Sequence, residues 1–573
     1  MHTPRTRPAL VLLLVLLVAA PAAAQRRAPA QSSALAASPR PRLVLLIVID
    51  QFRYDYLERF GDLFVADGLR RLLRDGASWT NADYDHMPTY TAPGHASLMT
   101  GTWGAEHGII ANEWFDRAAG KKITSVTDDA ARTLGDTSSP YSPRLLLAST
   151  LGDELRLATN DRAKVVGVSV KARSAILPAG RHASAAYWFS TQTGRMVSSN
   201  YYFNELPAWV ARFNDERRAD KLFGKPWERL LPEAEYLRRA GRDDAPWEDM
   251  TGIKDTNTFP HVVTGGAPAP GRDFYIALDY TPFTGDLLVD FAAAAITNEQ
   301  LGADADTDVL SVSFSGNDYV GHRFGPYSQE VMDVTLRVDR QIARLLAEVD
   351  RRVGLQNTLV VLSADHGVAP VPAQAAAVGL PGRRVERDQV LQALRAAITA
   401  RYRGADKQTA YVQSFINGQV YFDEAALRRD AVARTEIERV VCDAAAQLPY
   451  VARCFTRAQL EAGAFAPGDA VARRVLHGFN AQRSGDALVV YAPFVIQVSP
   501  PEPPDPPSNA THGAPYSYDT HVPLIIMGRG VRAGRYPQAA TPADIAPTLA
   551  TLLRVQPPSN ATGRVLTEAL ADR

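Results

Sequence analysis

Continuous apolar runs recur along the chain, and each is followed within a few residues by a change to polar or turn residues. The first run covers residues 43–49 and ends at Asp50. Runs without polar alternation are typical of central strands of a parallel sheet, because helices cover both faces of such a sheet. The same pattern recurs at residues 165–170 before Lys171, 309–314 before Asp318, 359–362 before Asp365 and 522–527 before Gly528.

Helix-forming stretches separate these runs. They cover residues 143–158, with Ser142 as a predicted N-cap, residues 328–353, and residues 542–553, with Thr541 as a predicted N-cap. This alternation of strand, loop and helix predicts an α/β fold with a doubly wound, mostly parallel sheet and helices on both faces. Ligands of such sheets bind beyond the carboxyl ends of the strands, so the polar residues that follow the runs are candidates for a functional site.

Two regions interrupt this pattern. Residues 181–300 are rich in Trp, Tyr, Arg and Pro and lack strong strand runs, so we expect an inserted cap region there. Residues 383–480 predict a small inserted α+β subdomain, because Asn417-Gly418 between two strand-like segments, 411–416 and 419–422, is a hairpin signal. Helical patterns at 387–402 and 435–448 flank this hairpin. We expect the catalytic α/β core to comprise the remaining residues, 41–180, 301–382 and 481–573.

The first residues of the chain have the layout of a secretory signal peptide. Arg5 and Arg7 precede an apolar stretch over residues 9–20, and three alanines at 22–24 precede Gln25. The apolar stretch is short for a membrane span, although an uncleaved anchor remains the alternative. We therefore predict a signal peptide over 1–24, a disordered leader over 25–40, and a secreted or periplasmic protein without stable membrane insertion after signal removal.

Composition and charge narrow the class of protein. The 573 residues are 46% apolar and 22% charged, which is ordinary for a soluble globular enzyme. Lys+Arg and Asp+Glu both number 62, so no net field attracts nucleic acid, and we expect no nucleic-acid binding. The two cysteines, Cys442 and Cys454, are compatible with a disulfide or with two buried thiols. The sequence does not specify an oligomeric state, and a monomer is our expectation.

The segment from Thr89 to His95 places a threonine ahead of a proline. Pro93 at the first helical position would leave Thr91 at a helix N-terminus, where free N–H groups and the helix dipole attract phosphate. A threonine hydroxyl is a poor nucleophile without a base or a metal ion. The alternative is that Thr91 is only an N-cap. For His95 we expect a packing role or a contact behind the ligands of the site.

Carboxylates and histidines with the chemistry of zinc ligands follow several of the predicted strands. Asp318 and His322 are one helical turn apart. Two adjacent residues of a strand point to opposite faces, so the adjacent pair Asp365-His366 serves one site only if the chain turns there, as Gly367 allows. His512 and His521 compete for a further ligand position, and His512 is favoured because its loop leaves the imidazole free to reach the site. The full predicted set is Asp50, Asp318, His322, Asp365, His366 and His512.

Lys171 and Arg173 follow the predicted strand at 165–170. Residues two apart in an extended segment face the same way, so both cations can converge on one anion. A guanidinium matches two phosphoryl oxygens, and an ammonium adds a point charge. Asn112 could donate an amide N–H to the same group. The alternative for Lys171 and Arg173 is a solvated basic end of a strand.

In combination, these segments resemble the alkaline phosphatase superfamily, and specifically the exported phosphate-irrepressible alkaline phosphatases with a threonine nucleophile. The resemblance rests on IDQFRYDYL at 49–57, TAPGHASLMTG at 91–101, VKAR at 170–173, NDYVGHRFGP at 317–326, SADHG at 363–367 and THGAPYSYDTHVPL at 511–524. It implies two Zn²⁺ ions per chain, one held by Asp318, His322 and His512, and the other by Asp50, Asp365, His366 and the Thr91 oxygen. Asn112, Lys171 and Arg173 would bind the phosphoryl oxygens.

The resemblance implies a hydrolase that cleaves small-molecule phosphate monoesters through a phosphothreonine intermediate. A nucleotide pyrophosphatase/phosphodiesterase of the same superfamily is the nearest alternative. Lys171 and Arg173 favour the hypothesis of monoester hydrolysis, because a monoester dianion needs two cations and a diester carries one negative charge. An arylsulfatase is disfavoured because neither cysteine lies in a Cys-x-Pro-x-Arg context. A catalytically dead phosphate-binding protein would have little need for a nucleophile between metal ligands.

Overall fold

The computed structural model describes residues 40–248, 256–402, 410–498 and 508–571. All of them fall within one compact unit of the chain. The predicted signal peptide and leader lie outside the described residues, apart from Arg40. Among the described residues, no helix is both long enough and apolar enough to cross a bilayer.

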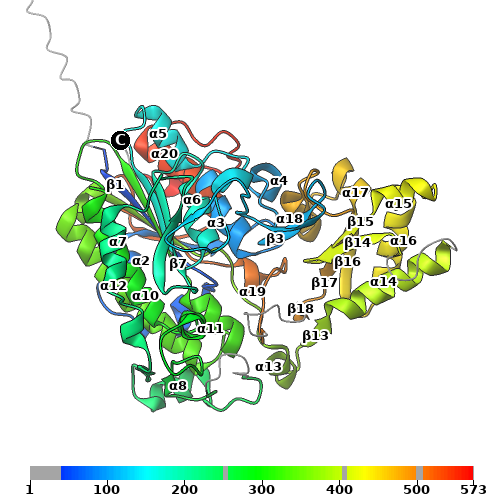
Figure 1. Ribbon diagram of the computed structural model, residues 1–573, viewed down its shortest axis with the longest axis horizontal. Helices are drawn as coiled ribbons and strands as arrows, with labels where there is room; N and C mark the ends of the chain where they lie inside the picture. Colours follow the sequence, from blue (N-terminus) through cyan, green and yellow to red (C-terminus); the bar gives the residue numbers. More distant parts are fainter. Residues whose placement is uncertain (1–39, 249–255, 403–409, 499–507, 572–573) are drawn as a thin grey trace, which may run out of the picture. The chain divides into compact units, whose positions relative to one another are not determined.

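A mixed sheet forms the centre of the fold (Figure 1). Within the described ranges it has ten strands, in the spatial order β20 (Gly534–Ala540), β2 (Ala77–Ala82), β19 (Leu524–Met527), β12 (Thr358–Ser363), β1 (Leu43–Ile49), β11 (Asp308–Phe314), β6 (Val165–Ser169), β7 (Ala185–Ser190), β8 (Arg195–Ser199) and β5 (Thr133–Leu134). The five strands from β12 to β7 are mutually parallel. Strands β19 and β8 join this block in the antiparallel sense. The predicted mostly parallel α/β sheet is confirmed.

Strand β1 shows why its apolar run has no polar interruption. All seven of its residues are buried. Leu45 and Ile47 belong to an apolar cluster with α10 (Phe283–Asn298) and α12 (Gln329–Arg352), whereas Leu46 and Val48 belong to a cluster with α3 (Thr91–Thr100), α5 (Leu151–Ala158) and α20 (Ile545–Leu553). Helices thus cover both faces (Figure 1). Each such side chain contributes about 1.5–3 kcal/mol by burial.

Helix starts follow the predicted capping residues with one difference. Thr541 caps η5 (Pro542–Asp544), which leads into α20, as predicted, and Ser328, expected as the first residue of its helix, caps α12. The single helix expected over 143–158 is instead a short turn, η2 (Pro143–Leu145), capped by Ser142, followed by α5. A capping box between Thr150 and Asp153 starts α5, because each side chain accepts the other residue's backbone N–H.

The inserted regions differ from their predicted boundaries. Part of 181–300, expected as cap, forms strands β7 and β8 of the central sheet, because alternate side chains there pack onto the apolar clusters of the core. Helices α7 (Ala208–Asp215), α8 (Glu233–Ala240), α9 (Arg272–Asp279) and α10 follow. The predicted hairpin is formed by β14 (Val412–Ile416) and β15 (Gln419–Phe422). Its sheet is completed by β17 (Ala487–Tyr491), which lies beyond the predicted boundary at 480, and by β16 (Val451–Thr456).

Helices α14 (Arg387–Arg401) and α16 (Arg434–Ala446) match the helical patterns expected in the small subdomain. Their apolar residues join one cluster with the hairpin strands. Cys442 on α16 forms a disulfide with Cys454 on β16. The structure thereby decides between the two alternatives that the cysteine spacing left open.

Candidate functional site

The carboxyl ends of four neighbouring parallel strands bring the predicted residues to one edge of the sheet. Strand β1 leads to Asp50, β12 to Asp365 and His366, and β6 to Lys171. Strand β11 is followed by α11 (Gly316–Phe324), which carries Asp318 and His322. Since β12, β1, β11 and β6 are consecutive in the sheet, segments far apart in the sequence meet here.

Thr91 is the first residue of α3 and is 1% exposed. The N-cap is Tyr90, and no side chain caps this helix, so Thr91 does not act as a cap. We had expected Pro93 to be the first helical residue, but it is the third. The Thr91 Oγ1 atom lies 3.4 Å from Nε2 of His366. The hydroxyl therefore points toward the imidazole and carboxylate groups at the sheet edge.

Asn112 lies next to the same helix end. Its Oδ1 accepts the backbone N–H of Ala92 at 2.8 Å. This bond satisfies one of the N–H groups that a helix leaves free at its start. It also fixes the orientation of the side-chain amide, so the amide nitrogen is left to donate to another acceptor near Thr91.

Asp318, His322 and His512 form a compact group whose potential ligand atoms lie within 4.8 Å of one another. Nε2 of His322 is 3.2 Å, and Nε2 of His512 is 3.6 Å, from Oδ1 of Asp318. Nδ1 of His322 donates to the carbonyl of Ala510, and Nδ1 of His512 to the carbonyl of Thr89, both at 2.7 Å. A protonated Nδ1 leaves the Nε2 lone pair free for a metal ion. Burial lowers the pKa of His512 well below its usual value, which favours the neutral form.

Asp50, Asp318 and His366 form a second compact group. Nε2 of His366 lies 3.5 Å from Oδ1 of Asp50, and its Nδ1 donates to the carbonyl of Gly367 at 2.8 Å. Nδ1 of His366 therefore carries the proton, as in His322 and His512, and its Nε2 lone pair is free. The turn that we expected at Gly367 therefore directs His366 into the site.

Asp365 lies between the second group and His95, and Asp318 is within reach of both groups. Its Oδ1 accepts the backbone N–H of Gln51 at 3.1 Å, and its Oδ2 lies 3.1 Å from Nδ1 of His95 and 3.5 Å from Nε2 of His366. These contacts hold Asp365 beside the second group, to which Asp318 also contributes a carboxylate. His95 lies behind the ligands, as expected for a residue one turn into α3.

The carboxylates of this site are charged groups in a buried volume. Burial raises the pKa of Asp50 well above its usual value, and the carboxylates of Asp318 and Asp365 raise it further. Burial would also raise the pKa of Asp318, but Lys171 and His322 outweigh it and hold that pKa well below its usual value. Oδ1 of Asp50 has no hydrogen-bond donor among the described residues. Buried anions require compensation, and this set of carboxylate oxygens and imidazole nitrogens fits zinc.

Lys171 is the cation of the site. Its Nζ lies 2.6 Å from Oδ2 of Asp50 and 2.5 Å from Oδ2 of Asp318, and 4.9 Å above the ring of Tyr319. Burial would lower the pKa of Lys171, but the two carboxylates outweigh it and raise the pKa. We had expected Lys171 and Arg173 to share an extended segment. Arg173 instead lies in the first turn of α6 (Ala172–Ala179). Both side chains nevertheless line one cavity of about 300 Å³.

Sequence reasoning missed two residues of the site. Gln51 donates from Nε2 to Oδ1 of Asp318 at 2.7 Å, and its backbone φ of 64° turns its N–H toward Asp365. Its position directly after Asp50 was the available signal. Tyr319 lies beneath Lys171, and no pattern in the sequence distinguishes it from other tyrosines.

The structure also separates the two histidines that competed for one position. His521 stacks on Tyr54 at 4.3 Å, and its Nε2 lies 3.1 Å from the carbonyl oxygen of Thr80. It therefore contacts strand β2. His512, which the sequence favoured, lies beside Asp318.

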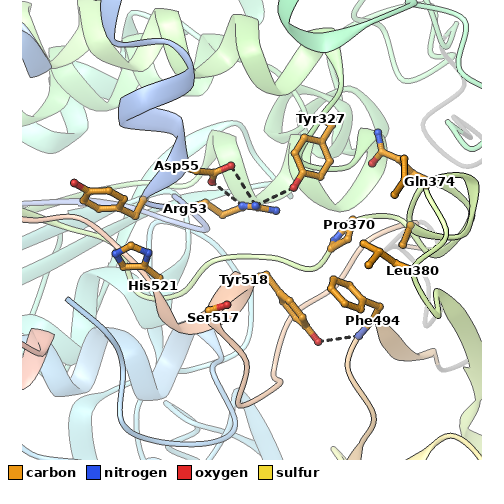
Figure 2. Close-up of a pocket in the computed structure, with 13 residues that line it drawn as sticks. Arg53, Asp55, Tyr327, Pro370, Gln374, Leu380, Phe494, Ser517, Tyr518 and His521 are labelled. Carbon is orange, nitrogen blue, oxygen red and sulfur yellow. Dashed lines mark hydrogen bonds and ion pairs between the residues drawn. The ribbon is translucent and has the colours of Figure 1, made fainter. Parts of the chain in front are cut away.

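A separate cavity of about 530 Å³ lies around Arg53 and is lined by Tyr327, Tyr518, Phe494 and His521 (Figure 2). None of the predicted site residues lines it. The Arg53 guanidinium donates to Asp55 at 2.8 Å and to the Tyr327 hydroxyl at 3.0 Å. Because the predicted ligand side chains gather at the strand ends and not in this cavity, the site at the strand ends is the better candidate.

Replacing Gly94 with alanine is expected to disturb the site although alanine is the best helix former. A Cβ on Gly94 would come within 2.3 Å of the backbone oxygen of Asp365, so α3 and the loop after β12 would have to separate. We expect a loss of about 1–3 kcal/mol in the free energy of unfolding. A shift of Thr91 relative to His366 would also lower kcat by about 100-fold.

Denaturant unfolding and initial rates measure these effects. Gly61→Ala is the matched control, because no atom lies within 4 Å of a Cβ built there. Unchanged stability and rate in Gly94→Ala would contradict the close approach of the two segments.

Comparisons with known proteins agree with this geometry. Residues 44–513 match the profile of the family described as type I phosphodiesterase/nucleotide pyrophosphatase. Three curated relatives align over 93% of this chain and at least 93% of their own length. They are alkaline phosphatase PafA of Elizabethkingia meningoseptica (36% identical, 95% of its length), alkaline phosphatase PhoV of Synechococcus elongatus (35%, 93%) and a protein of Myroides odoratus named calcium-transporting ATPase (35%, 95%). The crystal structure of wild-type PafA matches with a TM-score of 0.86 and 36% identity, over 93% of this chain and 100% of that one.

Proposed function

Because the chain belongs to the type I phosphodiesterase/nucleotide pyrophosphatase family, we propose that it is an exported alkaline phosphatase that hydrolyses small phosphate monoesters through a phosphothreonine on Thr91. The single observation that carries the proposal is the Thr91 hydroxyl, which lies at a helix N-terminus, 3.4 Å from Nε2 of His366 and beside two groups of metal-ligand side chains. The predicted signal peptide and the Cys442–Cys454 disulfide support export to an oxidising compartment.

Two zinc ions fit the side chains of this site. Asp318, His322 and His512 would hold one ion. Asp50, His366 and the Thr91 oxygen would hold the other, together with Asp365. When bound, the ions lower the pKa of a coordinated hydroxyl and stabilise negative charge on phosphoryl oxygens.

The residues of the chain position the reacting groups for two in-line displacements. In the first, the Thr91 oxygen forms a bond to phosphorus while the bond from phosphorus to the ester oxygen breaks and the alcohol leaves. In the second, a water oxygen attacks phosphorus, and the bond to Thr91 breaks. Two inversions give net retention at phosphorus. Asn112, Lys171 and Arg173 bind the non-bridging oxygens, where charge must be stabilised throughout phosphoryl transfer.

A phosphodiesterase is the second candidate, because the family profile that the chain matches carries that description. The two activities differ in charge at phosphorus. A monoester dianion gains more from the pair Lys171 and Arg173 than a diester monoanion does, and a diester also needs space for a second organic group.

Removal of both cations is expected to separate these candidates. In the variant with Lys171→Ala and Arg173→Ala, kcat/KM should fall at least about tenfold more for a phosphate monoester than for the matched diester, because charged hydrogen bonds to the dianion are lost. The control is Arg162→Ala with Lys164→Ala, which removes two exposed or partly exposed cations at the opposite end of β6. Rates on phenyl phosphate and diphenyl phosphate measure the effect, and an equal loss on both would contradict monoester selection by this pair.

A further inference from the structure

The cavity beside Lys171 and Arg173 extends the functional edge of the sheet by one more strand. Strands β6 and β7 are parallel neighbours, with Ser169 paired to Trp188. The segment that ends β7, residues 190–192, therefore lies at the same edge as Lys171, which follows β6. We call the cavity lined by both segments the β7 pocket. It has a volume of about 300 Å³.

Apart from Lys171, Arg173 and Asp279, the polar residues that line the β7 pocket are uncharged. Ser190, Thr191 and Gln192 supply two hydroxyls and an amide, and Ser139 and Tyr141 supply further hydroxyls. Each hydroxyl can donate one hydrogen bond and accept two, so those already bonded within the protein keep capacity for a ligand. Side chains of this kind match a ligand group that itself carries several hydroxyls.

Aromatic rings complete the lining. Trp188 is 3% exposed, and its ring lies 6.2 Å from that of Tyr141, while Tyr319 lines the side next to Lys171. Aromatic faces pack against the C–H groups of a ring, and hydroxyls and amides around them bind its polar groups. This combination suits a small neutral polar ring better than a purely apolar group.

The charges of the β7 pocket also limit its ligand. Its lining cations are Lys171 and Arg173, and its lining carboxylate is Asp279, among the described residues. The two cations are assigned to the phosphoryl group of the substrate, and Asp279 repels a second anion. The Nε atom of Arg173 is buried and has no hydrogen-bond partner among the described residues, so the charge of this guanidinium is only partly compensated within the protein. The pocket is therefore built for one dianion followed by a neutral group.

We propose that the β7 pocket binds the alcohol part of sugar phosphates and related polyol phosphates. This inference rests on the proposed function, because it assigns the phosphoryl group to Lys171 and Arg173. The volume lies at the lower end of ligand pockets, which suits one sugar ring. Esters of simple alcohols reach the same phosphoryl site without the hydrogen bonds to the β7 pocket.

The test compares glucose 6-phosphate with ethyl phosphate. The measured quantity is kcat/KM for glucose 6-phosphate divided by kcat/KM for ethyl phosphate. In the variant with Thr191→Val and Gln192→Ala, this ratio should fall about tenfold, as for one or two lost hydrogen bonds to neutral groups. Thr193→Val is the matched control, because Thr193 lies on the same turn and does not line the pocket. It should keep the wild-type ratio.

A second variant tests the same pocket by filling it. Thr191→Trp should lower the ratio as well, since an indole side chain occupies the space of the sugar. An unchanged ratio in both pocket variants, with wild-type hydrolysis of both esters, overturns the pocket assignment and leaves the proposed function standing. Hydrolysis of neither ester by the wild-type protein overturns both.

Discussion

Replacement of Thr91 by alanine is expected to lower kcat for phosphate monoesters by at least about 10 000-fold, because the variant lacks the oxygen that bonds to phosphorus. The substitution removes a small side chain at the start of α3, where Thr91 makes no capping bond, so the fold should persist. Release of phosphate under saturating substrate measures kcat. Labelled phosphate trapped on the denatured wild-type protein should map to Thr91 and be absent from the variant.

Thr91→Ser is the matched control for this prediction. Serine keeps a hydroxyl at the helix N-terminus, where the Thr91 Oγ1 lies 3.4 Å from His366 Nε2, so it should retain measurable turnover and phosphate labelling. Metal content in Thr91→Ala should stay near that of the wild type, because the carboxylates and imidazoles remain. Full activity of Thr91→Ala would remove this residue from the mechanism.

Removal of metal ions is expected to have the second large effect. The purified protein should contain two zinc ions per chain, and dialysis against a chelator should lower kcat by at least about 1000-fold, since such ions stabilise several kcal/mol of charge in the transition state. Added zinc should restore the rate. Metal analysis by mass spectrometry, together with rates before and after dialysis, measures both quantities.

Two histidines of the chain provide a matched pair for the metal prediction. His512→Ala should lower the zinc content toward one ion per chain, because its Nε2 lies 3.6 Å from Oδ1 of Asp318 in the first ligand group. His521→Ala should leave the zinc content unchanged, because that ring stacks on Tyr54 instead. Equal zinc content in the two variants, or an activity indifferent to chelation, would contradict the assignment of the ligands.

Several features followed from local sequence patterns. The apolar run before Asp50 predicted β1 with its bounds, since a strand covered on both faces requires apolar residues at every position. The hairpin at Asn417 and Gly418 followed from turn residues that tolerate positive φ, and both have it. The family and the alkaline phosphatase-like fold inferred from combined motifs are confirmed by the matched profile and by the TM-score of 0.86 to PafA.

Other features depended on how distant segments pack. Strands β7 and β8 were not distinguished from a cap, because their place in the sheet depends on pairing with β6 rather than on their own pattern. The same holds for the disulfide, since spacing alone does not determine how Cys442 and Cys454 face each other. Local propensity leaves such choices open until tertiary contacts are made.

The sequence by itself determined which side chains are candidates for the chemistry, because their types and their places after the strands are local properties. Only the tertiary structure decided how these side chains share the site: Asp318 lies within reach of both ligand groups, Gln51 connects Asp318 to Asp365, and Arg173 reaches the cavity of Lys171 from a helix. These relations depend on distances between atoms of strands and helices that are more than 100 residues apart in several cases, and the packing of the whole core sets them.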